Sequence, residues 1–214
     1  MSTPENPPPA AAGPAAVPAA DRRTLIADTA IALVAAGGLR GLTHRAVDGA
    51  AALPAGSTSY YFRTRTALIG ACYRRLAELD LADLDGDGSA HPPPAPADRD
   101  AAARMLGALL HEWLTRGRER QLARFELSLE AARNPELEPA LRQAGLAARA
   151  RAAGVLAALG APRPAESAEL LAAWTDGLLY DRLAGALAHS RPGPDPAELT
   201  AAARRMLDAA LAPA

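Results

Sequence analysis

Small hydroxylated residues, aromatic rings and arginines lie close together over residues 54–65, in the order PAGSTSYYFRTR. Ser and Thr hydroxyls both donate and accept hydrogen bonds, and a helix of small residues can bring its backbone close to another surface. The N-terminus of a helix also attracts phosphate through its free N–H groups and its dipole. Arginines beside it can bind a phosphate or a guanine edge with two hydrogen bonds. This chemistry fits the recognition of double-stranded DNA.

The residues around this cluster predict two short helices joined by a turn. Thr43 is a candidate N-cap for a helix over residues 44–51, which Pro54 separates from the next helix. Pro54 also fits the first turn of that next helix, which we expect to end at residue 61 or 62. Two helices in this order form a helix-turn-helix, whose second helix enters the major groove. The residues expected to contact DNA are Thr43, His44, Arg45, Ala55, Gly56, Ser57, Thr58, Ser59, Tyr60, Tyr61, Arg63 and Arg65.

The rest of the chain also repeats its apolar residues at helical spacing. One helix is expected to begin at Asp21 and to end at Gly37 and Gly38, and another is expected after the cap residue Thr64. The later segments continue this pattern, including a long helix over residues 137–159 and one over residues 166–190. No segment alternates as a strand does. The sequence therefore predicts an all-α fold of about nine helices.

Composition divides the chain into parts. Residues 1–20 are rich in Pro and Ala and nearly uncharged, which is typical of a disordered arm. We expect a helix-turn-helix DNA-binding domain over residues 21–66 and a larger helical domain for effector binding and dimerisation over residues 67–214. Residues 83–98 are expected to form a flexible linker. The linker begins like a calcium loop, but Pro94 stands where such a loop needs a bidentate Glu, so no metal site is predicted.

The charges are unevenly distributed, although the net charge is only −1. Residues 21–79 contain 8 Arg and 4 acidic residues, whereas the chain from residue 80 onward contains 15 Arg and 19 acidic residues. We therefore expect only the first part to face DNA. The single cysteine, Cys72, excludes an internal disulfide framework. A cytoplasmic protein with no membrane partner is expected, because no apolar run of about 18 residues and no leader segment occurs.

The segment over residues 24–71 resembles the N-terminal DNA-binding domain of the tetracycline-repressor (TetR) family of bacterial regulators. The most specific part of the resemblance is GLRGLTHRAVDGAAALPAGSTSYYFRTRTALIGA. Thr43 matches the Thr that opens the second helix in that family, and Arg65 matches the basic residue that opens the fourth. The family often places a phosphate-binding Tyr where this chain has Ser59, which leaves Tyr60 or Tyr61 for that role.

The resemblance implies a homodimer, whose last two long helices pair with those of the partner, and a ligand pocket inside each protomer. The helix over residues 166–190 is apolar over a wide arc, which indicates a second buried face. The expected dimer interface consists of Leu178, Leu179, Leu183, Leu187, Met206 and Leu207. Large rings and charged groups beside apolar stripes are the candidate ligand-binding residues, namely Trp113, Arg124, Phe125, Glu126, Glu130, Trp174, Asp176 and Tyr180.

The leading hypothesis is a ligand-responsive regulator, a repressor that binds a palindromic operator as a dimer and is released by an unidentified small molecule. The alternative is a DNA-binding regulator or scaffold without a small-molecule effector. An enzyme is not expected, because the sequence has no nucleophile elbow, phosphate loop or metal-ligand spacing, and its histidines are dispersed. No catalytic residue, metal or cofactor is therefore predicted.

Overall fold

The computed structural model of the chain describes residues 19–85 and 96–212. These residues form an all-α fold without strands, as the sequence predicts. Its helices are α1 (Ala19–Gly41), α2 (His44–Ala50), α3 (Ser57–Tyr61), α4 (Arg65–Asp85), α5 (Arg99–Leu114), α6 (Arg118–Arg133), η1 (Pro135–Leu137), α7 (Glu138–Ala158), α8 (Pro164–Leu183) and α9 (Pro196–Ala210). The arm expected at residues 1–20 falls almost wholly outside the described residues, as do residues 86–95 of the expected linker.

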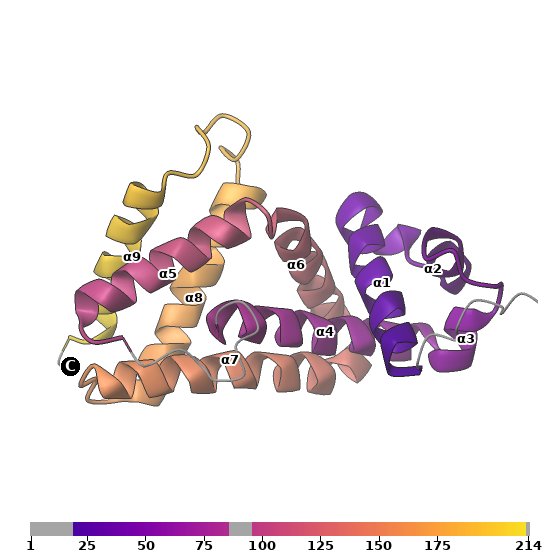
Figure 1. The fold of residues 1–214 in the computed structure, drawn as a ribbon, viewed down its shortest axis with the longest axis horizontal. Coiled ribbons are helices and arrows are strands. Elements are labelled where there is room, and N and C mark those ends of the chain that lie inside the picture. Colours follow the sequence, from indigo (N-terminus) through magenta and orange to yellow (C-terminus); the bar gives the residue numbers. More distant parts are fainter. Residues whose placement is uncertain (1–18, 86–95, 213–214) are drawn as a thin grey trace, which may run out of the picture.

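The helices gather into two groups along the long axis of the molecule (Figure 1). Helices α1, α2 and α3 lie at one end, and α5, α8 and α9 lie at the other. Helices α4 and α7 run lengthwise side by side between them, and the pair is in contact. Helix α4 also packs against α1 and α6. It therefore touches the first group through α1, and it reaches the second through the hydrogen bond from Trp113 of α5 to Asp83.

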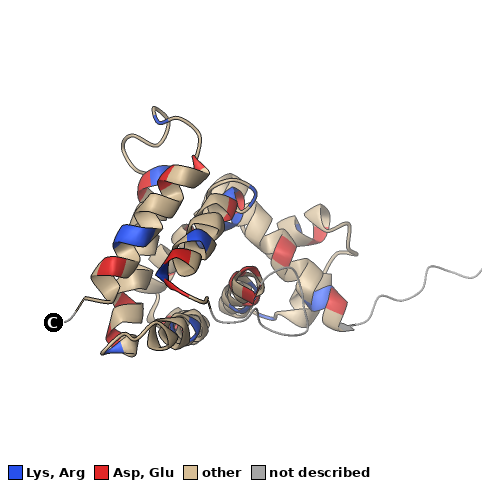
Figure 2. Cartoon of the chain, turned by 60° about the vertical axis from the view of Figure 1, so that its left-hand side comes forward, with Lys and Arg blue, Asp and Glu red and all other residues tan. Residues whose placement is uncertain are grey.

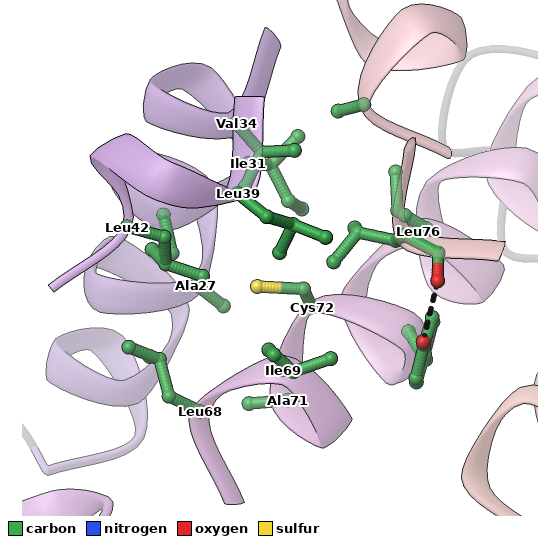
Figure 3. Packing of buried hydrophobic residues seen from close by; sticks show 14 of the residues in the cluster. Ala27, Ile31, Val34, Leu39, Leu42, Leu68, Ile69, Ala71, Cys72 and Leu76 are labelled. Carbon is green, nitrogen blue, oxygen red and sulfur yellow. Dashed lines mark hydrogen bonds between the residues drawn. The ribbon is translucent and has the colours of Figure 1, made fainter. Parts of the chain in front are cut away.

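The largest apolar cluster joins α4 to α1 and α6. Ile26 of α1, Leu68 of α4 and Leu127 of α6 are buried in it. Figure 3 shows the Cys72 side chain pointing into this cluster, between labelled residues of α1 and α4, and burial raises the pKa of its thiol to about 12. The Tyr73 hydroxyl donates a hydrogen bond of 2.8 Å to the Leu127 carbonyl. These contacts fix the first half of α4 to the helices beside it.

Three helix ends differ from the sequence prediction. Helix α1 is broken at Gly38, which has a φ of 65°, but the chain makes a further turn to Gly41. Helix α4 runs on to Asp85, into the expected linker, because Asp83 and Asp85 form ion pairs with Arg120 and Arg151. Helix α8 ends at Leu183 and not at residue 190, because the N–H groups of residues 184 and 185 both donate to one carbonyl at the end of the helix.

Residues Ala20–Gly41 are long and apolar enough to cross a membrane, judged by length and composition alone. In the fold their Ile26 and Ala30 side chains are fully buried, and Val34 is nearly so, in the cluster shared with α4 and α6. A core helix passes the same test of length and hydropathy. The packing of α1 is that of a core helix.

Candidate nucleic-acid interface and ligand cavity

The start of α3 is set by a buried carboxylate. Asp48 of α2 is 5% exposed and accepts hydrogen bonds from the backbone N–H groups of Gly56 and Thr58, each at 2.8 Å, and from the Thr58 hydroxyl at 2.6 Å. Burial alone would raise the pKa of Asp48, but the hydrogen bonds from Thr58 and Gly56 hold it below its usual value. Asp48 therefore fixes the orientation of α3 on α2.

The expected start of this helix at Pro54 is wrong. Residues 54–56 form a turn, in which Ser57 donates to the Pro54 carbonyl through both its N–H and its hydroxyl group. Gly56 has a φ of 88°, a left-handed conformation that glycine adopts without strain. The helix begins only after this turn, at Ser57.

Both predicted N-caps are confirmed. The Thr43 hydroxyl accepts a hydrogen bond of 3.0 Å from the Ala46 N–H at the start of α2. The Thr64 hydroxyl does the same for the Ala67 N–H at the start of α4. Each cap fixes the point where the chain turns into a helix beside α3.

Three residues expected to contact DNA are engaged within the protein. Thr58 is fully buried and its hydroxyl donates to Asp48, so it cannot present that hydroxyl to a base. His44 Nε2 lies 2.7 Å from the Phe62 carbonyl. The Arg65 guanidinium donates to the carbonyls of Leu39 and Leu42. These contacts link α1, α2 and α4 around α3, and the buried Thr58 is the one whose expected DNA contact the structure contradicts.

The other expected DNA contacts lie at or near the surface of the same end. Ser57 and Tyr61 are half-buried, and the exposed residues are Thr43, Arg45, Ala55, Gly56, Ser59, Tyr60 and Arg63. Tyr60 is 79% exposed, and its ring meets the ring of Tyr61 edge-on at 5.1 Å between centroids. The Arg23 guanidinium lies over the Tyr61 ring, 5.5 Å from its centroid, and donates to the Tyr61 carbonyl at 3.4 Å. Tyr60 is thus the freer of the two tyrosines.

Sequence reasoning missed Arg23 and Asp48 in this unit. One feature of the sequence could have identified Asp48 as a buried residue: it is an acidic residue beside the apolar Val47 and Ala50 in a short helix. No local sequence pattern could have identified Arg23, because its contact with Tyr61 depends on how α1 packs near the end of α3.

A cavity of about 1120 Å³ lies among α4, α5, α6, α7 and α8. Its walls are largely apolar, with Leu76 of α4, Leu109 of α5 and Leu146 of α7 among them. Three of the expected ligand-binding residues line it: Trp113, Arg124 and Asp176. A cavity of this size can hold a small organic molecule.

The other five expected ligand-binding residues do not line the cavity. On α6, Arg124 and Ser128 face it, and residues 125, 126 and 130 point elsewhere because each residue turns the helix by about 100°. Phe125 packs edge-on against Tyr180, with 5.5 Å between the ring centroids, and Glu126 and Glu130 lie on other faces of α6. Trp174 and Tyr180 are exposed on α8.

Two acidic residues of α4 that sequence reasoning did not select line the cavity. The Trp113 indole donates to Asp83 at 2.7 Å, and Arg120 forms an ion pair with the same carboxylate. Asp80 is 16% exposed, and burial raises its pKa to about 6, although Arg124 and Arg120 act against the shift. Leu76, Asp80 and Asp83 follow one another at spacings of four and three residues, so their common face was readable in the sequence.

The expected dimer interface is partly wrong. Leu179, Leu183 and Leu207 are buried inside the protomer, and Leu178 and Met206 pack against the same cores. Leu187 is exposed but lies beyond the end of α8. The large hydrophobic residues that α8 does expose are Leu170, Trp174 and Tyr180, and the exposed Ala173 and Gly177 lie on the same face.

The charges of the C-terminal helices are interleaved and pair with one another. Figure 2 shows acidic and basic segments alternating along these helices. Arg182 of α8 forms an ion pair with Glu198 of α9, and Arg204 of α9 forms one with Asp100 of α5. These pairs tie α8, α9 and α5 together.

A family model described as the tetracyclin repressor-like C-terminal domain matches residues 97–213. The chain belongs to the TetR family. The N-terminal resemblance and the C-terminal match therefore agree, and one chain carries both the predicted helix-turn-helix and the cavity. Membership makes it a transcriptional regulator of that family.

Solved TetR-like structures are similar over nearly the whole chain. The multidrug binding protein EbrR complexed with ethidium is 30% identical, with 90% of this chain and 99% of that chain covered and a TM-score of 0.65. A TetR family member from Streptomyces coelicolor A3 is 29% identical, with coverages of 90% and 99% and a TM-score of 0.66. A transcriptional regulator from Rhodococcus sp. Rha1, 24% identical, shares the fold over 88% of this chain and 95% of its own, with a TM-score of 0.69. None of the curated proteins compared with the chain matches it.

Proposed function

We propose that this TetR-family regulator acts in the cytoplasm as a ligand-responsive repressor, which binds a palindromic operator as a homodimer and is released by a small molecule. The observation that carries the proposal is the double role of α4. Its N-terminal Arg65 binds carbonyls of the α1–α2 connection, and its C-terminal half lines the cavity through Asp80 and Asp83. A ligand that displaces α4 therefore moves the DNA-binding helices. The structures of EbrR with ethidium and with imidazole support a small-molecule effector.

The DNA contacts are proposed for the exposed side chains around α3. Arg45 at the start of α2 reaches a base edge or a phosphate, and Arg63 after α3 binds the backbone. Ser59 and Tyr60 face outward from α3 itself, and Tyr60 is proposed to donate to a phosphate oxygen because Tyr61 is occupied by Arg23. The DNA sequence would then be recognised by a few side chains, while the backbone of α3 lies close to the floor of the major groove.

The dimer is proposed to form through the exposed apolar face of α8. Leu170, Trp174 and Tyr180 would be removed from water when a second copy covers them. Ala173 and Gly177 on the same face allow the two helices to approach closely. A two-fold arrangement would place two copies of α3 about 34 Å apart, one turn of B-DNA.

Release is proposed to work by population shift. The protomer pair would exist in an arrangement that matches successive major grooves and in one that does not. A ligand that binds the second arrangement more tightly lowers the DNA affinity by the coupling free energy, typically about 1 to 3 kcal/mol.

The proposal is tested by selecting binders from a pool of random duplex DNA with the full-length protein. We expect the wild type to enrich a palindrome, Arg45→Ala to relax the preferred sequence, and Trp174→Glu to lose the palindrome because the dimer no longer forms. Leu187→Glu is the matched control, since Leu187 is exposed but outside the α8 face. Failure of the wild type to enrich any sequence at low salt would overturn the DNA-binding role.

A further inference from the structure

Five charged side chains form a cluster where α4, α6 and α8 meet beside the cavity. They are Asp80, Asp83, Arg120, Arg124 and Asp176. Three carboxylates face two guanidinium groups, so the cluster carries a net charge of −1 when all five are ionised. Four of the five form two close ion pairs, Arg120 with Asp83 and Arg124 with Asp176. Asp80 is the residue left without a close partner.

Both guanidinium groups are committed to carboxylates other than Asp80. Arg120 forms its short ion pair with Asp83, which also accepts from the Trp113 indole. Arg124 donates to Asp176 at 2.7 Å and to the Gln121 side-chain oxygen at 2.7 Å. Because each arginine has a shorter contact with another partner, Asp80 keeps only the longer ion pair with Arg120 Nε, at 3.8 Å.

Asp80 is the surplus carboxylate of the cluster. Its hydrogen bond from Gln121 Nε2 is 3.5 Å long and its ion pair with Arg120 Nε is 3.8 Å long, both longer than a normal charge-assisted hydrogen bond. Arg120 Nε is itself buried without a hydrogen-bond partner among the described residues. The raised pKa of Asp80 reflects the same shortage, because burial outweighs the attraction of the arginines. The carboxylate is therefore able to accept a further cationic or donor group.

The cavity that Asp80 lines has walls that are largely apolar, with charged side chains among them. Met105, Leu106 and Leu109 of α5 line the cavity together with Leu141 and Leu146 of α7. A charged group loses much of its hydration when it enters an apolar cavity. A fixed charge of opposite sign inside the cavity therefore stabilises a bound ion strongly. An organic cation with an apolar body can satisfy both the carboxylate and the walls.

Building on the ligand response proposed above, we propose that the cavity binds an apolar organic monocation and that the Asp80 carboxylate holds its charged centre. The cation neutralises the net negative cluster, whereas an anion would meet repulsion there. Asp80 lies on α4, 15 residues beyond Arg65, or about 22 Å along the helix axis. The ligand thus binds directly to the helix that also contacts the DNA-binding unit.

Arg149 is one of the arginines of the cavity wall that an anionic ligand could use. It lines the cavity from α7, and its guanidinium donates at 3.2 Å to the Gly145 carbonyl of its own helix. If the ligand is an anion bound by Arg149, substitution of Arg149 should weaken its binding. If it is a cation bound by Asp80, substitution of Asp80 should weaken its binding instead. The ligand class can therefore be tested by comparing ions of opposite charge in the wild type and in variants of these two residues.

The test uses tetraphenylphosphonium and tetraphenylborate, two ions of nearly equal shape and opposite charge. Their binding to the full-length protein is measured by titration calorimetry at pH 7.5 in the absence of DNA. We expect the wild type to bind the phosphonium at least tenfold more tightly than the borate. Asp80→Asn is expected to weaken phosphonium binding at least tenfold without weakening borate binding, and Arg149→Gln is expected to leave phosphonium binding unchanged.

Three results would overturn the proposal: equal phosphonium affinity in Asp80→Asn and the wild type, tighter binding of the borate by the wild type, or binding of neither ion. Unfolding curves of each variant show whether the fold is retained. Operator binding is measured on the same preparations, so that a failure of the proposed ligand class can be distinguished from a failure of the proposed DNA-binding function. DNA binding without phosphonium binding overturns only the ligand class, and phosphonium binding without DNA binding overturns only the regulatory function.

Discussion

Two buried aspartates, one in each half of the molecule, have opposite environments. Asp48 between α2 and α3 accepts three hydrogen bonds of 2.6 to 2.8 Å, and its pKa is held below the usual value. Asp80 beside the cavity has only contacts of 3.5 and 3.8 Å, and its pKa is raised to about 6.

The difference teaches what each half of the molecule needs. The DNA-binding half needs a rigid recognition helix, and Asp48 stabilises it because its carboxylate is fully satisfied. For the proposed ligand response the cavity half needs an open charge, and Asp80 destabilises the unliganded protein because its carboxylate lacks a close partner. The following variants separate a structural carboxylate from a ligand-binding one.

Asp48→Asn is expected to have the largest effect. The substituted amide cannot accept from all the donors of Gly56 and Thr58, so buried N–H groups lose a charged partner. We expect the free energy of unfolding to fall by about 3 kcal/mol. Operator affinity should fall at least tenfold, because α3 loses its orientation. Urea unfolding and fluorescence anisotropy with a labelled operator measure the two effects, and an unchanged stability would refute the structural role of Asp48.

Asp80→Asn is expected to stabilise the protein at pH 7. The pKa of Asp80 is about 6 in the folded chain against an ordinary value of 3.8, so the folded state binds the proton more tightly than the unfolded state. The free energy of unfolding therefore falls as the pH rises from about 4 to about 6, by up to about 3 kcal/mol. The uncharged amide avoids this loss, so the variant should gain about 3 kcal/mol at pH 7.

The gain of Asp80→Asn should disappear near pH 4, where the wild-type carboxyl is protonated in the folded state. Arg120, Gln121 and Arg124 of α6 face Asp80 together with Asp83 of its own helix, and all remain in the variant. Thermal unfolding of both proteins from pH 4 to pH 7 measures the difference. A stability difference that does not vary over this range would contradict the proposed state of Asp80.

Thr58→Val is expected to have the smallest effect of the three. It removes one of the three hydrogen bonds to Asp48 and keeps the shape of the side chain. We expect a loss of about 1 kcal/mol in the free energy of unfolding and a modest loss of operator affinity. Ser59→Ala, on the exposed side of α3, is the matched control and should leave stability unchanged. Equal stability of the two variants would show that the buried hydroxyl contributes nothing.

The sequence predicts the helices of the DNA-binding half well, because their signals are local. Thr43 and Thr64 cap the helices that directly follow them. The start of α3 was placed too early, because Asp48, on another helix, captures the N–H groups that set it. The inward role of Thr58 and the role of Arg65 were missed for the same reason, since both depend on contacts with another helix.

The cavity was less predictable because five helices build it. Trp113, Arg124 and Asp176 were identified, but nearby residues on the same helices face away from the cavity. The aromatic ring of Trp174 was assigned to the ligand site, although it lies on the exposed face of α8. Helical spacing says which residues share a face, but only the packing of the helices decides what each face meets.

The most direct test of the central claim is the affinity for the selected operator with and without saturating tetraphenylphosphonium, measured by fluorescence anisotropy with wild type and Asp80→Asn. We predict that the ion weakens wild-type binding by about 5- to 150-fold, the usual range of such coupling, and that it leaves the variant unchanged. If calorimetry shows that the ion is bound while the operator affinity of the wild type stays the same, the cavity and the DNA-binding helices are not coupled. That result would favour a DNA-binding regulator without a small-molecule effector.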